Sequence, residues 1–288
     1  MQSARFAIGF AIVALRAFAA DPTYLVRSVS AIQPKQSDLT TATAHYRPVF
    51  GVGDPDQAQL KGVARYGELT VDPGGASELV SYPAEEQVYF VLDGNGVLLY
   101  DGQKQPIKKW DVMYLPLNIK HGVANSSDRP VRVMVMGFKI PAGTTVPPFP
   151  KLLLGNANDT RLQQLSGHGD TSQFRLLVGP NPGQDVVTAG SQIVEVYMME
   201  FTPGGTNLPH HHDNAEEIYY VLRGHGDMVA GDGVDGSEGR HRAKEGDAYF
   251  VRLNGTIGFY SGAKEGEQHD LILAVRSRYP FRQRSRSD

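Results

Sequence analysis

Short runs of apolar and β-branched residues recur along the whole chain, and glycine- and proline-rich stretches separate them. The runs at residues 131–136, 218–222 and 270–275 show the pattern most plainly. Such runs, roughly four to eight residues long between turn signals, are typical of β-strands, whereas the spacing of an amphipathic helix is scarce here. Residues 231–236, rich in glycine and aspartate, fit a hairpin turn between two further strands. The pattern therefore predicts an all-β protein.

One turn-and-strand segment, residues 204–224, also carries chemistry. Side chains alternate between the two faces of a strand, so His210 and His212 point the same way and His211 points the opposite way. With Glu217 they offer two neutral imidazoles and a carboxylate, a set that suits iron, manganese, nickel, copper or zinc. Three ligands would leave coordination positions open for water or substrate. The alternative is a solvated histidine cluster in a surface loop.

The same segment occurs twice, 130 residues apart, since Gly74 and Gly94 of the first copy correspond to Gly204 and Gly224 of the second (204 − 74 and 224 − 94). Internal duplication of this kind predicts two similar domains. In the first copy the three ligand positions have lost their imidazoles and their carboxylate, and are occupied by Val80, Tyr82 and Gln87. We therefore expect the first domain to hold no metal.

The proline-rich residues 140–150 favour an extended connector between the two halves. We place the first domain at residues 21–148 and the second at 149–288. Residues 152–154 and 174–178 are then the leading elements of the second domain.

The five positions Gly204, His210, His212, Glu217 and Gly224, with their spacing, resemble the first sequence motif of the cupin superfamily. The resemblance implies that the two histidines and the glutamate are metal ligands inside a small antiparallel β-barrel. A second motif in that family supplies a fourth ligand, usually histidine. The chain as a whole resembles a bicupin, which implies two tandem antiparallel β-barrels of the jelly-roll type.

The second motif is incomplete in the second half, because the position expected for the fourth ligand is Ile257, which cannot bind metal. We expect a three-ligand site like the arrangement of two histidines and one carboxylate in non-haem iron oxygenases. His269 as a replacement ligand, or a weakly held metal, are the alternatives. The first half retains His121 at this position, and a lone histidine in a barrel interior is more often a hydrogen-bonded core residue.

The resemblance leaves the reaction open. The order of elements is loosely similar to that of ureidoglycine aminohydrolases, which are manganese enzymes, but their metal ligands differ from those expected here. Other bicupins are oxalate decarboxylases, dioxygenases or seed storage proteins. We predict a metal-dependent dioxygenase, hydrolase, isomerase or decarboxylase for a small carboxylate or enolisable substrate, or else a non-catalytic ligand-binding or structural bicupin. Glu216 is an acid–base candidate, although strand alternation directs it away from Glu217.

The first twenty residues differ from the rest. Arg5 precedes an apolar run at residues 6–15, and small residues stand before Asp21, which predicts a secretory signal peptide at residues 1–20 and a periplasmic or secreted protein. A buried N-terminal strand or helix is the alternative. The run is shorter than the ~20 apolar residues that span a bilayer, so no membrane partner is expected.

Composition narrows the partners further. The absence of cysteine rules out thiolate ligands, and a formal net charge of −3 gives no general attraction to nucleic acid. The basic residues 282–286 are expected to form a solvated tail. A small molecule is the expected partner, and exposed edge strands allow pairing between copies of the chain.

Overall fold

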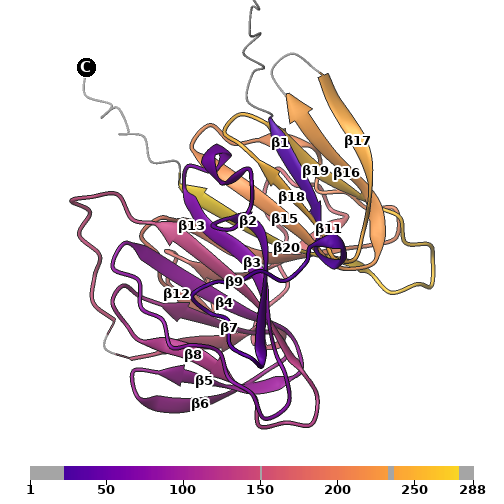
Figure 1. The fold of residues 1–288 in the computed structure, drawn as a ribbon. Helices are drawn as coiled ribbons and strands as arrows, with labels where there is room; N and C mark the ends of the chain where they lie inside the picture. The colour runs from indigo at the N-terminus through magenta and orange to yellow at the C-terminus, as the bar shows by residue number, and fades with distance from the viewer. Residues whose placement is uncertain (1–22, 150, 233–236, 279–288) are drawn as a thin grey trace, which may run out of the picture.

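The computed structural model describes residues 23–149, 151–232 and 237–278, which form two β-rich domains joined side by side (Figure 1). Within these ranges the regular structure is strand apart from three 3₁₀ turns, η1 (Val29–Ala31), η2 (Gln57–Gln59) and η3 (Ala157–Asp159). The prediction of an all-β protein is confirmed. The proposed signal peptide, the basic tail and residues 233–236 lie outside the described residues. No helix among the described residues is long and apolar enough to cross a membrane.

The first domain consists of a six-stranded and a three-stranded sheet. The larger sheet has the order β10 (Leu153–Asn156), β7 (Asp111–Leu115), β4 (Glu85–Asp93), β9 (Val131–Lys139), β3 (Val63–Val71) and β2 (Ala44–Gly51). The smaller sheet has the order β6 (Gln103–Lys108), β5 (Asn95–Tyr100) and β8 (His121–Ala124).

The second domain repeats this plan with seven and four strands. Its larger sheet has the order β1 (Tyr24–Ser28), β18 (Asp247–Val251), β15 (Ala215–Arg223), β20 (Asp270–Arg278), β13 (Ile193–Phe201), β11 (Ser172–Gly179) and β12 (Val187–Thr188). Its smaller sheet has the order β14 (His210–His211), β19 (Thr256–Ser261), β16 (His225–Asp232) and β17 (Ser237–Lys244). None of the four sheets closes on itself, so each domain is a jelly roll of two facing sheets. The strands β16 and β17 pair antiparallel, as the predicted hairpin requires.

The two domains exchange edge strands. The first strand of the described residues, β1, pairs antiparallel with β18 of the second domain, from Tyr24 opposite Val251 to Ser28 opposite Asp247. Conversely β10, which follows the connector, pairs antiparallel with β7 of the first domain. The prediction that residues 152–154 lead into the second domain is wrong for this strand, because its backbone hydrogen bonds complete the sheet of the first.

The large sheets are buried on both faces. One face of each packs against the small sheet of its own domain, and the other faces pack against each other between the domains. On β15, Tyr219 belongs to the interior of the second domain, whereas Ile218 and Tyr220 belong to the core between the domains. Continuous apolar runs are the expected sequence of strands covered on both sides. This explains why residues 218–222 lack polar alternation.

Two buried carboxylates fasten this interface, one from each domain. Glu86 on β4 accepts hydrogen bonds from the backbone N–H groups of residues 191–193 of the second domain, at 2.6 to 3.1 Å, and from the Tyr114 hydroxyl at 2.8 Å. Glu216 on β15 accepts from the N–H groups of Lys61 and Gly62 of the first domain at 2.7 to 3.1 Å. Glu86 and Glu216 stand 130 positions apart and are equivalent in the internal repeat. Each domain therefore contributes the same kind of contact, a buried carboxylate that accepts backbone N–H groups of the other domain.

Candidate metal centre

Strand pairing brings the three predicted ligands to one place inside the second domain. Glu217 lies on β15 on the same face as Tyr219, which belongs to the interior core of the second domain. His210 begins β14, where it pairs with Ile257 of β19, and His212 follows the end of that short strand. The turn before them contains Leu208 at φ +58°, a left-handed conformation that is costly for a branched residue and common near functional sites.

One ligand atom from each of His210, His212 and Glu217 lies within 4.8 Å of the others. The inward atoms are His210 Nε2, His212 Nε2 and Glu217 Oε2, all buried, and the only polar contact among them is that of His212 Nε2 with Glu217 Oε2 at 3.2 Å. The other ring nitrogen of His210 faces the carbonyl oxygen of Leu208 at 2.8 Å. A carbonyl can only accept, so this Nδ1 carries the proton and Nε2 keeps a free lone pair.

The surroundings of Glu217 keep it ionised. The Tyr197 hydroxyl donates to Glu217 Oε1, and Arg276 stands opposite Glu217 on β20. Burial alone raises the pKa of Glu217, but the hydrogen bond and charge of His212, followed by Arg276 and His210, lower it to about 2. Two imidazoles with free lone pairs and one ionised carboxylate, buried together without full hydrogen bonding, fit a divalent transition metal.

Three other residues considered in the sequence lie elsewhere. The side chain of Glu216 points to the domain interface, where backbone N–H groups of Lys61 and Gly62 occupy its carboxylate, so it does not reach the metal ligands. His269 pairs with Glu200 at 2.9 Å and is not part of the ligand cluster. Ile257 is 1% exposed and packs in the core. We therefore propose no acid–base role for Glu216 and no ligand role for His269.

One histidine beside the cluster was not singled out from the sequence. The ring of His168 stands 5.0 Å from that of His210, centroid to centroid, at an interplanar angle of 81°. Burial, followed by the neighbouring His210, lowers the pKa of His168, so its imidazole is neutral at neutral pH. The sequence carried no signal for it, because His168 stands in a stretch without motif residues.

The Cupin domain family model matches residues 67–137 and 197–256, one segment in each structural domain. The chain is a two-domain cupin. An uncharacterized protein of Methanocaldococcus jannaschii is 28% identical over 71 residues, which is 25% of this bicupin and 57% of that relative. The bicupin therefore spans little more than half the length of the curated relative that it matches.

Solved structures share the fold at low identity. The putative glyoxylate-induced protein of Pseudomonas aeruginosa superposes with a TM-score of 0.69 and 17% identity, over 99% of this bicupin and 100% of that chain. An oxalate decarboxylase from Bacillus subtilis, studied for its Mn(II) centres, superposes with a TM-score of 0.66 and 12% identity, over 89% of this chain and 78% of that one.

In the first domain of the bicupin, Arg65 and its hydrogen-bond partners lie where the second domain has its metal ligands. Arg65 is 5% exposed, and its guanidinium donates to Asp38 at 3.0 Å and to Glu85 at 2.9 Å. The Tyr82 hydroxyl also donates to Asp38, at 2.9 Å, and Gln87 donates to Glu85 at 2.9 Å. Because Tyr82 and Gln87 are the counterparts of His212 and Glu217, a protein cation lies against the former ligand positions.

His121 is the counterpart of Ile257, because its bridge to Val80 matches the pairing of Ile257 with His210. It is 1% exposed, its Nδ1 faces the carbonyl oxygen of Ile119 at 2.8 Å, and its ring meets Tyr89 edge-on. Burial lowers the pKa of His121 from 6.5 to about 4. These contacts fit the expected hydrogen-bonded core residue.

A pH-dependent stability follows from His121. Between pH 6.5 and 4 the unfolded chain binds a proton at this residue and the native protein does not, so stability decreases as the pH falls through this window. The expected loss is about 3 kcal/mol. Urea unfolding of the wild type and of His121→Gln at several pH values checks it: the variant should lose less stability on acidification. The same substitution at the exposed His211 is the control, and identical slopes for wild type and His121→Gln would refute the assignment.

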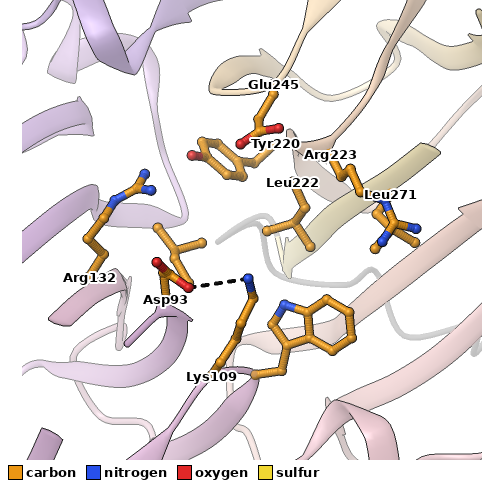
Figure 2. Close-up of a pocket in the computed structure, with 10 residues that line it drawn as sticks. Asp93, Lys109, Arg132, Tyr220, Leu222, Arg223, Glu245 and Leu271 are labelled. Carbon is orange, nitrogen blue, oxygen red and sulfur yellow. Dashed lines mark hydrogen bonds and ion pairs between the residues drawn. The ribbon is translucent and has the colours of Figure 1, made fainter. Parts of the chain in front are cut away.

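A separate cavity of about 250 Å³ lies between the domains (Figure 2). Charges of both signs line it, including Arg132 and Glu245, and Lys109 pairs with Asp93 at 3.3 Å. The cavity contains none of the three metal ligands. It is also smaller than the ~300 Å³ at which ordinary ligand pockets begin. The histidine cluster is therefore the stronger candidate for the functional site.

Proposed function

We propose that this bicupin is a metal-dependent enzyme that acts on a small carboxylate or enolisable substrate in its second domain. The observation that carries the proposal is the convergence of His210 Nε2, His212 Nε2 and Glu217 Oε2, all buried and without full hydrogen bonding. The Mn(II) centres of a structurally similar oxalate decarboxylase support both the kind of metal and the kind of substrate. Iron, nickel and zinc suit the same three ligands.

The residues around the ligands would position the reacting groups. A divalent metal at this site supplies a Lewis acid that polarises a carboxylate or carbonyl oxygen and lowers the pKa of bound water. Tyr197 holds one oxygen of Glu217 and so directs the other toward the histidines. Arg276, which also forms an ion pair with Glu195, lies with its guanidinium 5.6 Å from the centre of the Tyr197 ring. This support fixes the carboxylate before a substrate arrives.

The shape of the interior limits the substrate. Large buried side chains fill the domain around the ligands, among them Phe174, Phe259 and Tyr219. An open depression of about 410 Å³ is lined by residues 164–167 and Gly169, on the loop that carries His168. These features favour a molecule of a few carbon atoms, and the apolar walls exclude bulk water from the reacting centre.

Turnover by the metal-loaded protein tests the proposal. Metal-free protein is loaded separately with Mn²⁺, Fe²⁺, Ni²⁺ and Zn²⁺ and incubated with short mono- and dicarboxylates and 2-oxo acids, while carbon dioxide release, oxygen uptake and substrate loss are followed. We expect turnover with at least one metal. The Glu217→Gln variant should lose it, and His211→Ala should keep it. Protein that binds metal stoichiometrically but turns over no compound with any metal would instead be a non-catalytic binding protein.

A further inference from the structure

The loop before β11 holds His168 beside the metal ligand His210. Gly167 and Gly169 on either side have φ values of +86° and +76°, which glycine adopts without strain. The Ser172 hydroxyl donates to the His168 carbonyl at 3.0 Å, and the Gln164 side chain donates to the Gly169 carbonyl at 2.8 Å. The position of the imidazole is therefore set by the loop.

His168 has the same tautomer as the ligand His210. Its Nδ1 faces the carbonyl oxygen of Ser166 at 3.1 Å, just as Nδ1 of His210 faces the carbonyl oxygen of Leu208. In both rings the carbonyl fixes the proton on Nδ1 and leaves a lone pair on Nε2. Each histidine is bonded to the residue two positions before it, so both rings are oriented by the same local device.

The ring spacing also fits a shared ion. The rings of His168 and His210 are 5.0 Å apart at 81°, and those of His210 and His212 are 5.0 Å apart at 82°. Two imidazoles that bind one metal at ~2.1 Å through neighbouring coordination positions have ring centres roughly 5 Å apart. The ring of His168 therefore has nearly the same distance and angle to the ring of His210 as the ring of His212 has.

The equivalent loop of the first domain, which precedes β2, provides further support through Asp38. The isolated bridges Lys35–Tyr46 and Gln163–Phe174 align the two loops and place Asp38 two residues before the position of His168. Asp38 accepts hydrogen bonds from the Arg65 guanidinium at 3.0 Å and from the hydroxyl of Tyr82, the counterpart of His212, at 2.9 Å. Asp38, from the loop of the first domain, therefore binds the Arg65 guanidinium, which is the cation at this place. The equivalent loop of the second domain carries an imidazole instead of a carboxylate.

We infer that His168, from the loop before β11, is the fourth protein ligand of the metal and replaces the histidine that the second motif lacks at Ile257. The inference rests on the proposed function, because it presupposes a metal held by His210, His212 and Glu217. A six-coordinate metal with these four ligands retains two open positions, enough for a bidentate carboxylate.

Zinc binding by single variants tests the inference. Metal-free wild type, His168→Ala, His168→Gln and the control His211→Ala are titrated with Zn²⁺ against a competing chelator, and the number of bound imidazoles is counted by X-ray absorption of the zinc-loaded proteins. We expect roughly 100-fold weaker binding and one imidazole fewer in both His168 variants, and wild-type behaviour in His211→Ala. Equal melting temperatures of the metal-free proteins would show that the fold is intact.

Wild-type affinity and an unchanged imidazole count in both His168 variants would overturn the inference. Titration of His212→Ala in parallel separates this failure from that of the proposed function. If His212→Ala loses zinc while the His168 variants keep it, the three-ligand site stands and only the fourth ligand is refuted. If His212→Ala also keeps zinc with wild-type affinity, the metal site itself is refuted.

Discussion

Replacing His212 with alanine is expected to weaken the binding of Mn²⁺ or Fe²⁺ at least about 100-fold, to the point where the purified protein carries no stoichiometric metal. The reason is geometric, since His212 Nε2 is one of three buried atoms that converge within 4.8 Å, and its removal opens the ligand set around the ion. Metal analysis of the purified protein, with titration of the metal-free form, measures the effect.

The neighbouring histidine provides the matched control. His211 points away from the cluster and is exposed, so His211→Ala should retain the metal content of the wild type. The two variants differ by one position in the same short stretch, which excludes a general effect of removing a histidine there. Unchanged metal stoichiometry in His212→Ala would contradict the site.

Replacing Glu86 with alanine should lower the free energy of unfolding by on the order of 4 kcal/mol. The carboxylate is fully buried, and its loss leaves three backbone N–H groups at residues 191–193 and the Tyr114 hydroxyl without their acceptor. Each unsatisfied buried donor costs roughly 1 to 3 kcal/mol, and water entering the space recovers part of this. Equilibrium unfolding in urea measures the change.

Two further variants sharpen that experiment. Glu86→Gln keeps one acceptor oxygen without the charge and should lose about half as much stability. Glu78→Ala removes an exposed carboxylate from the segment that precedes β4 and should change stability by less than about 0.5 kcal/mol. A loss below about 1 kcal/mol for Glu86→Ala would show that water satisfies the N–H groups as well as the carboxylate does.

Strand periodicity predicted the all-β fold, the 130-residue repeat predicted the duplication, and the spacing of the motif at residues 204–224 predicted the three ligands. Alternation along one strand was enough to separate Glu217 from Glu216, and the structure places them on opposite faces of β15. The same rule paired His210 with His212 and turned His211 outward. Local spacing carries this information because side-chain direction in a strand changes with every residue.

The partners that come from distant segments were not predictable in this way. Tyr197 and Arg276 meet Glu217 only because β13, β20 and β15 are neighbours in one sheet, and strand order is not written in any single strand. The place of His168 depends on a loop conformation. The ion pairs of Arg65 in the first domain were not predictable either. The presence of Val80, Tyr82 and Gln87 at the ligand positions does not show which side chain fills the space between them.

The exchange of β1 and β10 changes where this protein can be divided. The proline-rich stretch before residue 150 joins two strands of the same sheet, β9 and β10, and the backbone passes from one jelly roll to the other between η1 and β2 and again between η3 and β11. A gene split at residue 149 would therefore yield an N-terminal fragment with an uncovered β7 edge and a C-terminal fragment with an uncovered β18 edge. Each fragment would carry the strand that the other needs, so the halves are folding partners and not independent modules.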